Sequence, residues 1–151
     1  MRVSAKTDYA VRAAAELAAS PDGPVKGERL ADSQDIPLQF LEHILLDLKH
    51  AGIVRARRGA KGGYWLAKPA EDVSIAEVIR AVEGPIANVQ SAPPESITYR
   101  GSAEQLQSVW IAVRASLREV LENVSLAELV SGTLPANVQA LADSKDAWSP
   151  R

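Results

Sequence analysis

The sequence predicts a mainly α-helical fold with one short β-hairpin. Apolar residues recur at three- and four-residue spacing over most of the chain, which is the helical period. Three serines are each followed three residues later by Glu or Gln, the capping box that starts a helix. One glycine-rich segment lies between two short runs of β-forming residues, as in a hairpin. The 151 residues suffice for one compact domain and an extra element for self-association.

Three helices are expected before the hairpin. Ser4 can cap the first, which stops before the Pro21–Pro24 turn. A short second helix is predicted near residues 27–33. The third begins at Pro37, where proline suits a first helical turn, and ends at Gly52. We expect the inward stripe of this third helix to consist of Phe40, Leu41, Ile44, Leu45 and Leu48.

The hairpin is predicted from two β-forming runs, residues 53–56 and 64–67, on either side of the flexible tip Arg58–Gly63. Helix, short helix, helix and hairpin is the order of a winged helix-turn-helix domain, in which the hairpin is the wing. We assign residues 1–84 to this DNA-binding domain, including a further helix that Gly84 ends.

The second half is predicted to contain more helices. The capping boxes are Ser74 with Glu77, Ser102 with Gln105, and Ser125 with Glu128. We expect a loop at 85–101, dimerisation helices over 102–132, of which the first, about 103–123, is the longest, and a polar C-terminal tail over 133–151.

The long helix carries more apolar surface than a small winged domain needs. Its stripe has a period near 3.5 residues, which favours a helix–helix seam with a second copy of the chain. Packing back onto the winged domain is the alternative. The predicted dimerisation residues are Leu106, Val109, Trp110, Val113, Leu117, Val120 and Leu121.

Charge and composition limit the function classes. The net charge is −2, but residues 1–69 hold 11 Lys/Arg and 8 Asp/Glu, whereas residues 70–151 hold 6 and 11. The anion-binding surface is therefore expected in the first half. With no cysteine and two histidines far apart, we expect no metal and no cofactor, and no nucleophile–base pair indicates an enzyme. Without a signal peptide or membrane span, we expect a cytoplasmic protein and no membrane partner.

Two segments can contact double-stranded DNA. The N-terminal end of the third helix leaves side chains outward that can read bases in the major groove. The wing offers arginine and glycine for the narrow minor groove, and a cation on the first helix can reach a phosphate. A solvated helix face and a charged surface turn are the alternatives. The candidate residues are Lys6, Leu38, Gln39, Glu42, His43, Arg57, Arg58, Gly59 and Lys61.

Five segments carry a resemblance to a known family, namely Lys6–Ala10, Ile36–Glu42, Leu48–Val54, Arg58–Tyr64 and Val78–Gly84. Together they resemble the IscR/NsrR/CymR family of bacterial regulators, also called the Rrf2 family, over about residues 1–131. The wing segment RGAKGGYWLA followed by a helix ending in AVEG is the most specific part.

The resemblance implies a homodimeric winged-helix repressor or activator whose long helix crosses its partner. It implies base contacts from Leu38, Gln39, Glu42 and His43, minor-groove insertion of Arg58 with Gly59, and wing support from Lys61. Many members sense iron, nitric oxide or redox state through a cluster held by three cysteines. Residues 88–100 lie in that region and contain no thiol, so the resemblance implies a member without the usual cluster, responding to a small-molecule or protein effector.

The leading hypothesis is a sequence-specific transcriptional regulator, a repressor, that binds a palindromic operator as a homodimer. The alternative is a winged-helix module that uses the same surfaces to bind another protein without specific DNA binding. Salt dependence separates them, because operator recognition keeps a specific component after non-specific affinity has been screened.

Overall fold

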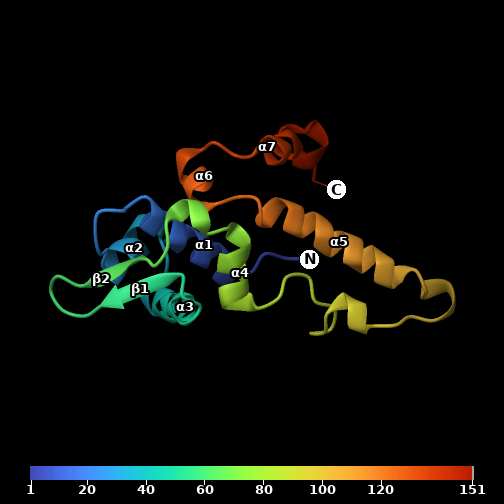
Figure 1. Ribbon diagram of the computed structural model, residues 1–151, viewed down its shortest axis with the longest axis horizontal. Helices are drawn as coiled ribbons and strands as arrows, with labels where there is room; N and C mark the ends of the chain where they lie inside the picture. The colour runs from blue at the N-terminus through green and yellow to red at the C-terminus, as the bar shows by residue number, and fades with distance from the viewer. Residues whose placement is uncertain (151) are drawn as a thin grey trace.

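The computed structural model describes residues 1–150 and confirms the predicted class, a mainly helical chain with a two-stranded antiparallel sheet (Figure 1). The N-terminal elements are α1 (Ala5–Ala18), α2 (Gly27–Gln34), α3 (Leu38–His50), β1 (Val54–Arg57), β2 (Gly63–Leu66) and α4 (Ile75–Glu83). The later helices are α5 (Leu106–Leu121), α6 (Leu126–Ser131) and α7 (Ala136–Asp143). The order α1, α2, α3 and hairpin is that of a winged helix-turn-helix.

Helix α1 is the centre of the core. Its inward residues Ala10, Ala13 and Ala14 are fully buried, and their small side chains let neighbouring helices approach closely. Helices α3, α4 and α6 all pack against α1. The large core side chains come mainly from α3, where the predicted stripe is fully buried at Leu41, Ile44, Leu45 and Leu48. This burial fixes the orientation of α3 on the domain.

Phe40 does not belong to the inward stripe, and its prediction was wrong. The side chain is 43% exposed, and its ring meets Tyr9 edge-on with the centroids 5.6 Å apart. At 100° per residue, Phe40 lies a quarter turn from Leu41 and reaches only the edge of the core. It therefore packs between α1 and the exposed side of α3.

Two of the three predicted capping boxes are present, those of Ser74 with Glu77 and Ser125 with Glu128. Although burial opposes it, hydrogen bonds from Lys68 and Ser74 lower the pKa of Glu77 below its usual range. The prediction of a capping box at Ser102 was wrong. Gly101 has a φ of +59° and starts a 3₁₀ turn over 101–103, so the backbone at Ser102 is not extended as an N-cap requires.

The wing is tied to the domain by an extended segment before α2. Strands β1 and β2 pair from Val54 with Leu66 to Arg57 with Gly63. Val25 then exchanges two backbone hydrogen bonds with Tyr64, each 2.8 Å long. Because Val25 is buried, this bridge holds the base of the wing against the core.

After α5 the chain returns to the winged domain. Leu126 in α6 is fully buried in the core, and its amide donates to the Val73 carbonyl at 2.8 Å. The Ile75 amide donates to Val124 at 2.9 Å. Helix α6, expected among the dimerisation helices, thus contributes to the same core as α1.

Helix α5 extends away from the domain beside a folded loop (Figure 1). The Gln107 side-chain amide donates to the carbonyls of Pro94 and Ile97, the latter at 2.6 Å. Arg114 pairs with Glu95 at 2.6 Å, and a backbone hydrogen bond together with this guanidinium lowers the pKa of Glu95. These contacts fasten the loop to the outer half of α5.

The C-terminal segment is more ordered than the predicted polar tail. It contains α7 and a 3₁₀ turn, Lys145–Trp148, and the Trp148 indole donates to the Ala142 carbonyl. The polar tail prediction overlooked the apolar residues of α7, which include Val138 and Leu141. Within residues 1–150, none of the helices has the length and apolarity needed to cross a membrane.

Candidate nucleic-acid interface

The outward face of α3 brings three predicted base-reading residues together. Gln39, Glu42 and His43 are exposed, and their side chains form no hydrogen bond or ion pair within residues 1–150. They lie opposite the buried stripe on the first two turns of α3. Leu38 is half-buried and packs against the core, so it limits how far the start of α3 can move.

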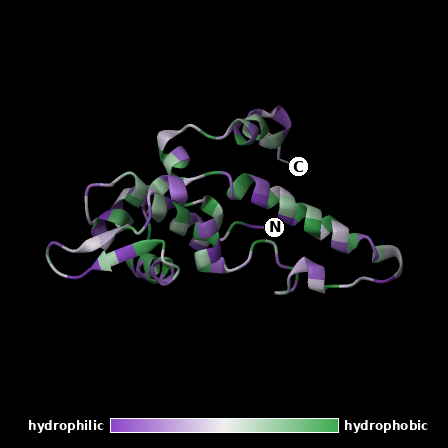
Figure 2. Ribbon diagram, viewed as in Figure 1, coloured by the Kyte–Doolittle hydropathy of each residue, from purple (hydrophilic) through white to green (hydrophobic). Residues whose placement is uncertain are grey.

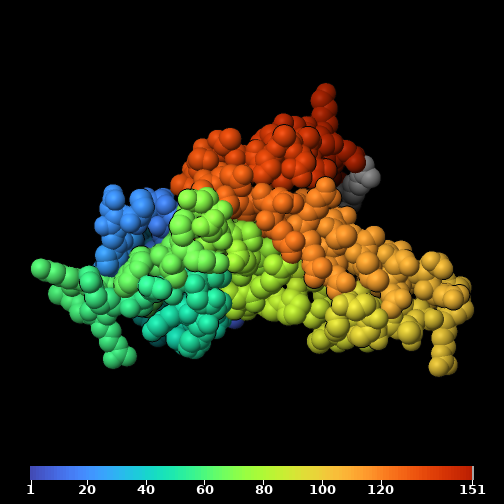
Figure 3. All heavy atoms as spheres, viewed as in Figure 1, coloured from blue at the N-terminus to red at the C-terminus, as the bar shows by residue number. Residues whose placement is uncertain are grey.

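The wing projects from one end of the molecule (Figure 3). Its tip is stabilised by three contacts to backbone carbonyls. The Gly62 amide donates to Gly59 at 3.0 Å, Lys26 Nζ donates to Gly59 at 2.6 Å, and the Arg57 guanidinium donates to Lys61 at 3.0 Å. Arg57 therefore helps to build the tip.

Arg58, like Lys61, is a free cation of this tip. It is exposed, and within residues 1–150 its guanidinium has no hydrogen-bond or ion-pair partner. Gly59 follows with a φ of +102°, a backbone conformation that residues other than glycine rarely adopt. The next positions, Ala60 and Lys61, are exposed as well. The wing thus presents a guanidinium beside a narrow stretch of backbone, as insertion into a minor groove requires.

Gly62 is required by close approach of the backbone. A Cβ atom at this position would stand 2.0 Å from the Arg57 carbonyl oxygen. We expect Gly62→Ala to rearrange the tip and displace Arg58, lowering affinity for operator DNA about tenfold, the value of one good base or groove contact. Fluorescence anisotropy on a selected DNA site measures the change, and circular dichroism checks the fold.

Ala60→Ser is the matched control for Gly62→Ala, because Ala60 is exposed on the same tip. Its affinity is expected to stay at the wild-type value. Wild-type affinity of a folded Gly62→Ala protein would show that the tip geometry is not needed for binding.

A groove of about 450 Å³ separates α3 from the wing. Its charged lining residues are the cations Lys26, Lys49, Arg57 and Arg58 and the acids Glu28 and Glu42. A row of cations between a major-groove helix and a minor-groove wing suits the phosphate backbone that separates the two grooves. Sequence reasoning did not assign Lys26, because its place here depends on the Val25–Tyr64 bridge.

Lys6 is less available than the other predicted residues. Its Nζ lies 2.8 Å from a carboxylate oxygen of Asp47 on α3, and each of these side chains is 36% exposed. The ion pair links α1 to α3 away from the wing. A phosphate contact by Lys6 would have to share its charge with this carboxylate.

The predicted dimerisation stripe lies on a helix that the single chain covers only in part. None of the residues of α5 is buried, and Val109 is 50% exposed. Figure 2 shows apolar residues along the exposed length of the helix. The other six stripe residues are half-buried, and Leu117 and Leu121 lie near α4 across a shared hollow.

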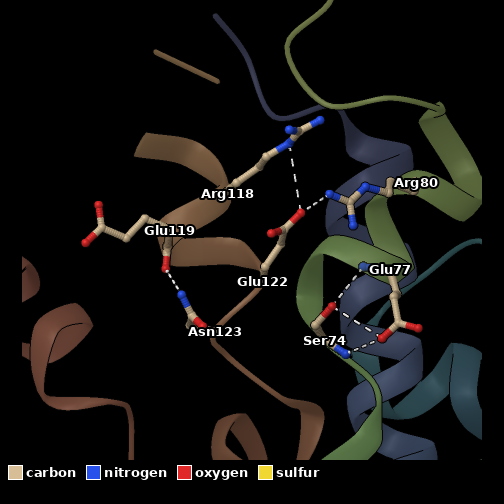
Figure 4. A network of polar contacts seen from close by, with 7 residues as sticks. All are labelled: Ser74, Glu77, Arg80, Arg118, Glu119, Glu122 and Asn123. Atoms are coloured by element: carbon tan, nitrogen blue, oxygen red, sulfur yellow. Dashed lines mark hydrogen bonds and ion pairs between the residues drawn. The ribbon is translucent and has the colours of Figure 1, made fainter. Parts of the chain in front are cut away.

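A polar joint connects the winged domain to α5 (Figure 4). Arg80 on α4 forms an ion pair with Glu122, the residue that caps the end of α5. Arg118, one turn earlier on α5, lies 3.9 Å from the same carboxylate. Asn123 donates to the Glu119 carbonyl at 2.7 Å and closes the helix end. One carboxylate thus joins guanidinium groups from both elements.

Residues 88–100, where the family resemblance implies a cluster site in other members, do not fit a cluster here. A three-thiolate site needs cysteines, and the chain has none. Residues 1–150 also contain no group of three or more His, Asp or Glu side chains that could hold a metal ion. The loop is instead fastened by Gln107 and Arg114.

Comparisons with known proteins agree with this geometry. The profile of the Rrf2 family, described as an iron-dependent transcriptional regulator, matches residues 3–132. Rv1287 of Mycobacterium tuberculosis is 46% identical over 95% of this chain and 89% of its own length. The HTH-type transcriptional regulator CymR of Bacillus subtilis is 31% identical over 88% of this chain and 92% of its own.

Solved structures give the same result. The structure of CymR, the global cysteine regulator of B. subtilis, matches with a TM-score of 0.74 at 30% identity, covering 88% of this chain and 98% of that one. The structure of T. potens IscR matches with a TM-score of 0.70 at 31% identity, covering 100% and 93%. These relatives are regulators and not enzymes. The chain belongs to the Rrf2 family of winged helix-turn-helix, DNA-binding transcriptional regulators.

Proposed function

We propose that this regulator is a repressor that binds a palindromic operator as a homodimer. The observation that carries the proposal is the free guanidinium of Arg58 on a wing separated from the reading face of α3 by a cation-lined groove. A helix for the major groove and a wing for the adjacent minor groove contact DNA on the same side of the domain. Because its proposed partner is double-stranded DNA, we propose that the protein acts in the cytoplasm.

In this proposal each predicted residue has a distinct role. Gln39, Glu42 and His43 read base edges, with Leu38 setting the depth of the helix. Arg58 and Gly59 enter the minor groove. Arg57 supports the tip by donating a hydrogen bond to the backbone carbonyl of Lys61. The Lys61 side chain supports the wing with its charge, and Lys6 adds charge near the phosphates. The reading domain comprises residues 1–84, with α6 packed against it.

The homodimer is proposed from α5. A helix without buried residues, carrying an apolar stripe from Leu106 to Leu121, gains stability by covering that stripe with a second copy. A two-fold dimer presents two reading heads to two half-sites, and this matches a palindrome. The signal is proposed to be a small molecule or a protein, because a thiolate-held cluster does not fit this chain.

The experiment is selection of bound fragments from random DNA by the purified protein at about 150 mM salt, followed by a salt titration on the enriched site. A two-fold motif with half-sites about one helical turn apart is the expected result. Affinity that disappears equally for all sequences as salt rises would contradict operator recognition and favour a module that binds another protein.

A further inference from the structure

Leu46 is an exposed leucine on the DNA-reading side of α3. Its side chain is 47% exposed, although the core lies on the opposite side of the same helix. Leu46 follows Gln39 by seven residues and His43 by three, so all three share one helix face. The reading face therefore continues beyond the polar residues into an apolar position.

The surroundings of Leu46 indicate what covers it. It lines the groove between α3 and the wing together with Glu42, Lys49, Arg57 and Arg58. An apolar side chain among charges gains no stability in the free protein, and here it stays in contact with water. The groove carries four cations against the two carboxylates of Glu28 and Glu42, so it suits an anionic partner that also offers an apolar group to the leucine. Double-stranded DNA meets both conditions.

We propose that Leu46 recognises thymine through its 5-methyl group, the apolar substituent that bases present in the major groove. Seven residues of helix correspond to about 10 Å, or about three base-pair steps. For a reading helix that lies along the DNA axis, this spacing points to a thymine in each half-site, about three base pairs from the base that Gln39 contacts. This inference rests on the proposed operator binding and adds a specificity-determining residue to it.

Deoxyuridine substitution tests the contact directly, because it removes the methyl group and leaves Watson–Crick pairing unchanged. Each thymine of the selected operator is replaced in turn, in both half-sites symmetrically, and Kd is measured for the wild-type protein and for Leu46→Ala at one salt concentration. One position is expected to weaken wild-type binding about fourfold per half-site, or about fifteenfold for the pair, the value of one buried methyl group. The same substitution is expected to leave Leu46→Ala binding unchanged.

Leu129→Ala is the control for loss of an exposed leucine, since Leu129 is 38% exposed on α6, away from the groove. It is expected to respond to deoxyuridine as the wild-type protein does. Equal responses of Leu46→Ala and the wild-type protein at every thymine would overturn the inference while operator binding stands. A loss by Leu46→Ala that is the same on all DNA sequences would also overturn it and assign Leu46 to the sugar-phosphate backbone. Absence of any selected site would instead refute the proposed function.

Discussion

Val109→Glu is expected to separate the dimer into monomers and to weaken binding to the two-fold operator by about 10²- to 10⁴-fold. Val109 is half exposed in the single chain, so the substitution leaves the monomer fold intact. In the proposed dimer it places two carboxylates in an apolar seam, where burial of charge is costly. Without the seam, each reading head binds its half-site alone. Sedimentation velocity and a Kd on the selected operator measure the two effects.

Ala115→Glu is the matched control. Ala115 is exposed on α5, about 120° around the helix from Val109 and directly opposite Leu106 in the apolar stripe. The Ala115→Glu substitution introduces the same charge on the same helix. The variant protein is expected to remain a dimer and to bind the operator with wild-type affinity. A Val109→Glu protein that sediments as a dimer would contradict the α5 seam. Equal loss of affinity in both variants would show general charge repulsion of DNA and not a broken interface.

Arg58→Ala is expected to weaken operator binding by about 10- to 100-fold and to relax the preference for A·T-rich flanks. The free guanidinium has no partner within residues 1–150, so its removal leaves the wing hydrogen bonds in place. A narrow A·T minor groove has a strongly negative potential that attracts an inserted arginine. Repeated selection with the variant measures the flank preference, and anisotropy measures the affinity.

Arg55→Ala removes the same charge from β1, where Arg55 is exposed and lies opposite Trp65 in the hairpin, away from the tip. It is expected to lower affinity slightly and equally on all sequences, as a long-range charge does. Arg58→Lys keeps the charge and loses the planar guanidinium, and it should recover affinity only in part. Unchanged flank preference in Arg58→Ala would argue strongly against minor-groove insertion.

Local chemistry made much of this fold predictable from sequence. The glycine tip, the stripe of α3 and the capping boxes at Ser74 and Ser125 depend on residues close together in the chain. The prediction that Phe40 is an inward residue was wrong because packing at the edge of the core leaves it exposed. The prediction that Ser102 caps a helix was wrong because the positive φ of Gly101 starts a 3₁₀ turn there. The spacing of apolar residues does not determine how wide the buried stripe of a helix is. The spacing of Ser and Glu or Gln does not determine which serine has the extended backbone of an N-cap.

The candidate interface was predictable in its parts and not in its assembly. Arg58 and the exposed α3 residues could be identified from charge and helical period. Lys26 could not, because it joins the wing only through pairing of Val25 with Tyr64, two segments far apart in sequence. The same holds for Leu126, whose burial in the winged domain follows from long-range hydrogen bonds.

The ion-pair joint at Glu122 is a point about which α5 can rotate as a lever relative to the winged domain. The helix has 16 residues and is about 24 Å long, so a rotation of about 8° at the joint moves its far end by about 3.4 Å, one base-pair step. In a dimer held by two such levers, the joint sets the distance between the reading heads. We therefore expect a signal that shifts Arg80 relative to Glu122 to put the heads out of phase with the two half-sites and release the operator, although it never touches the DNA-binding face.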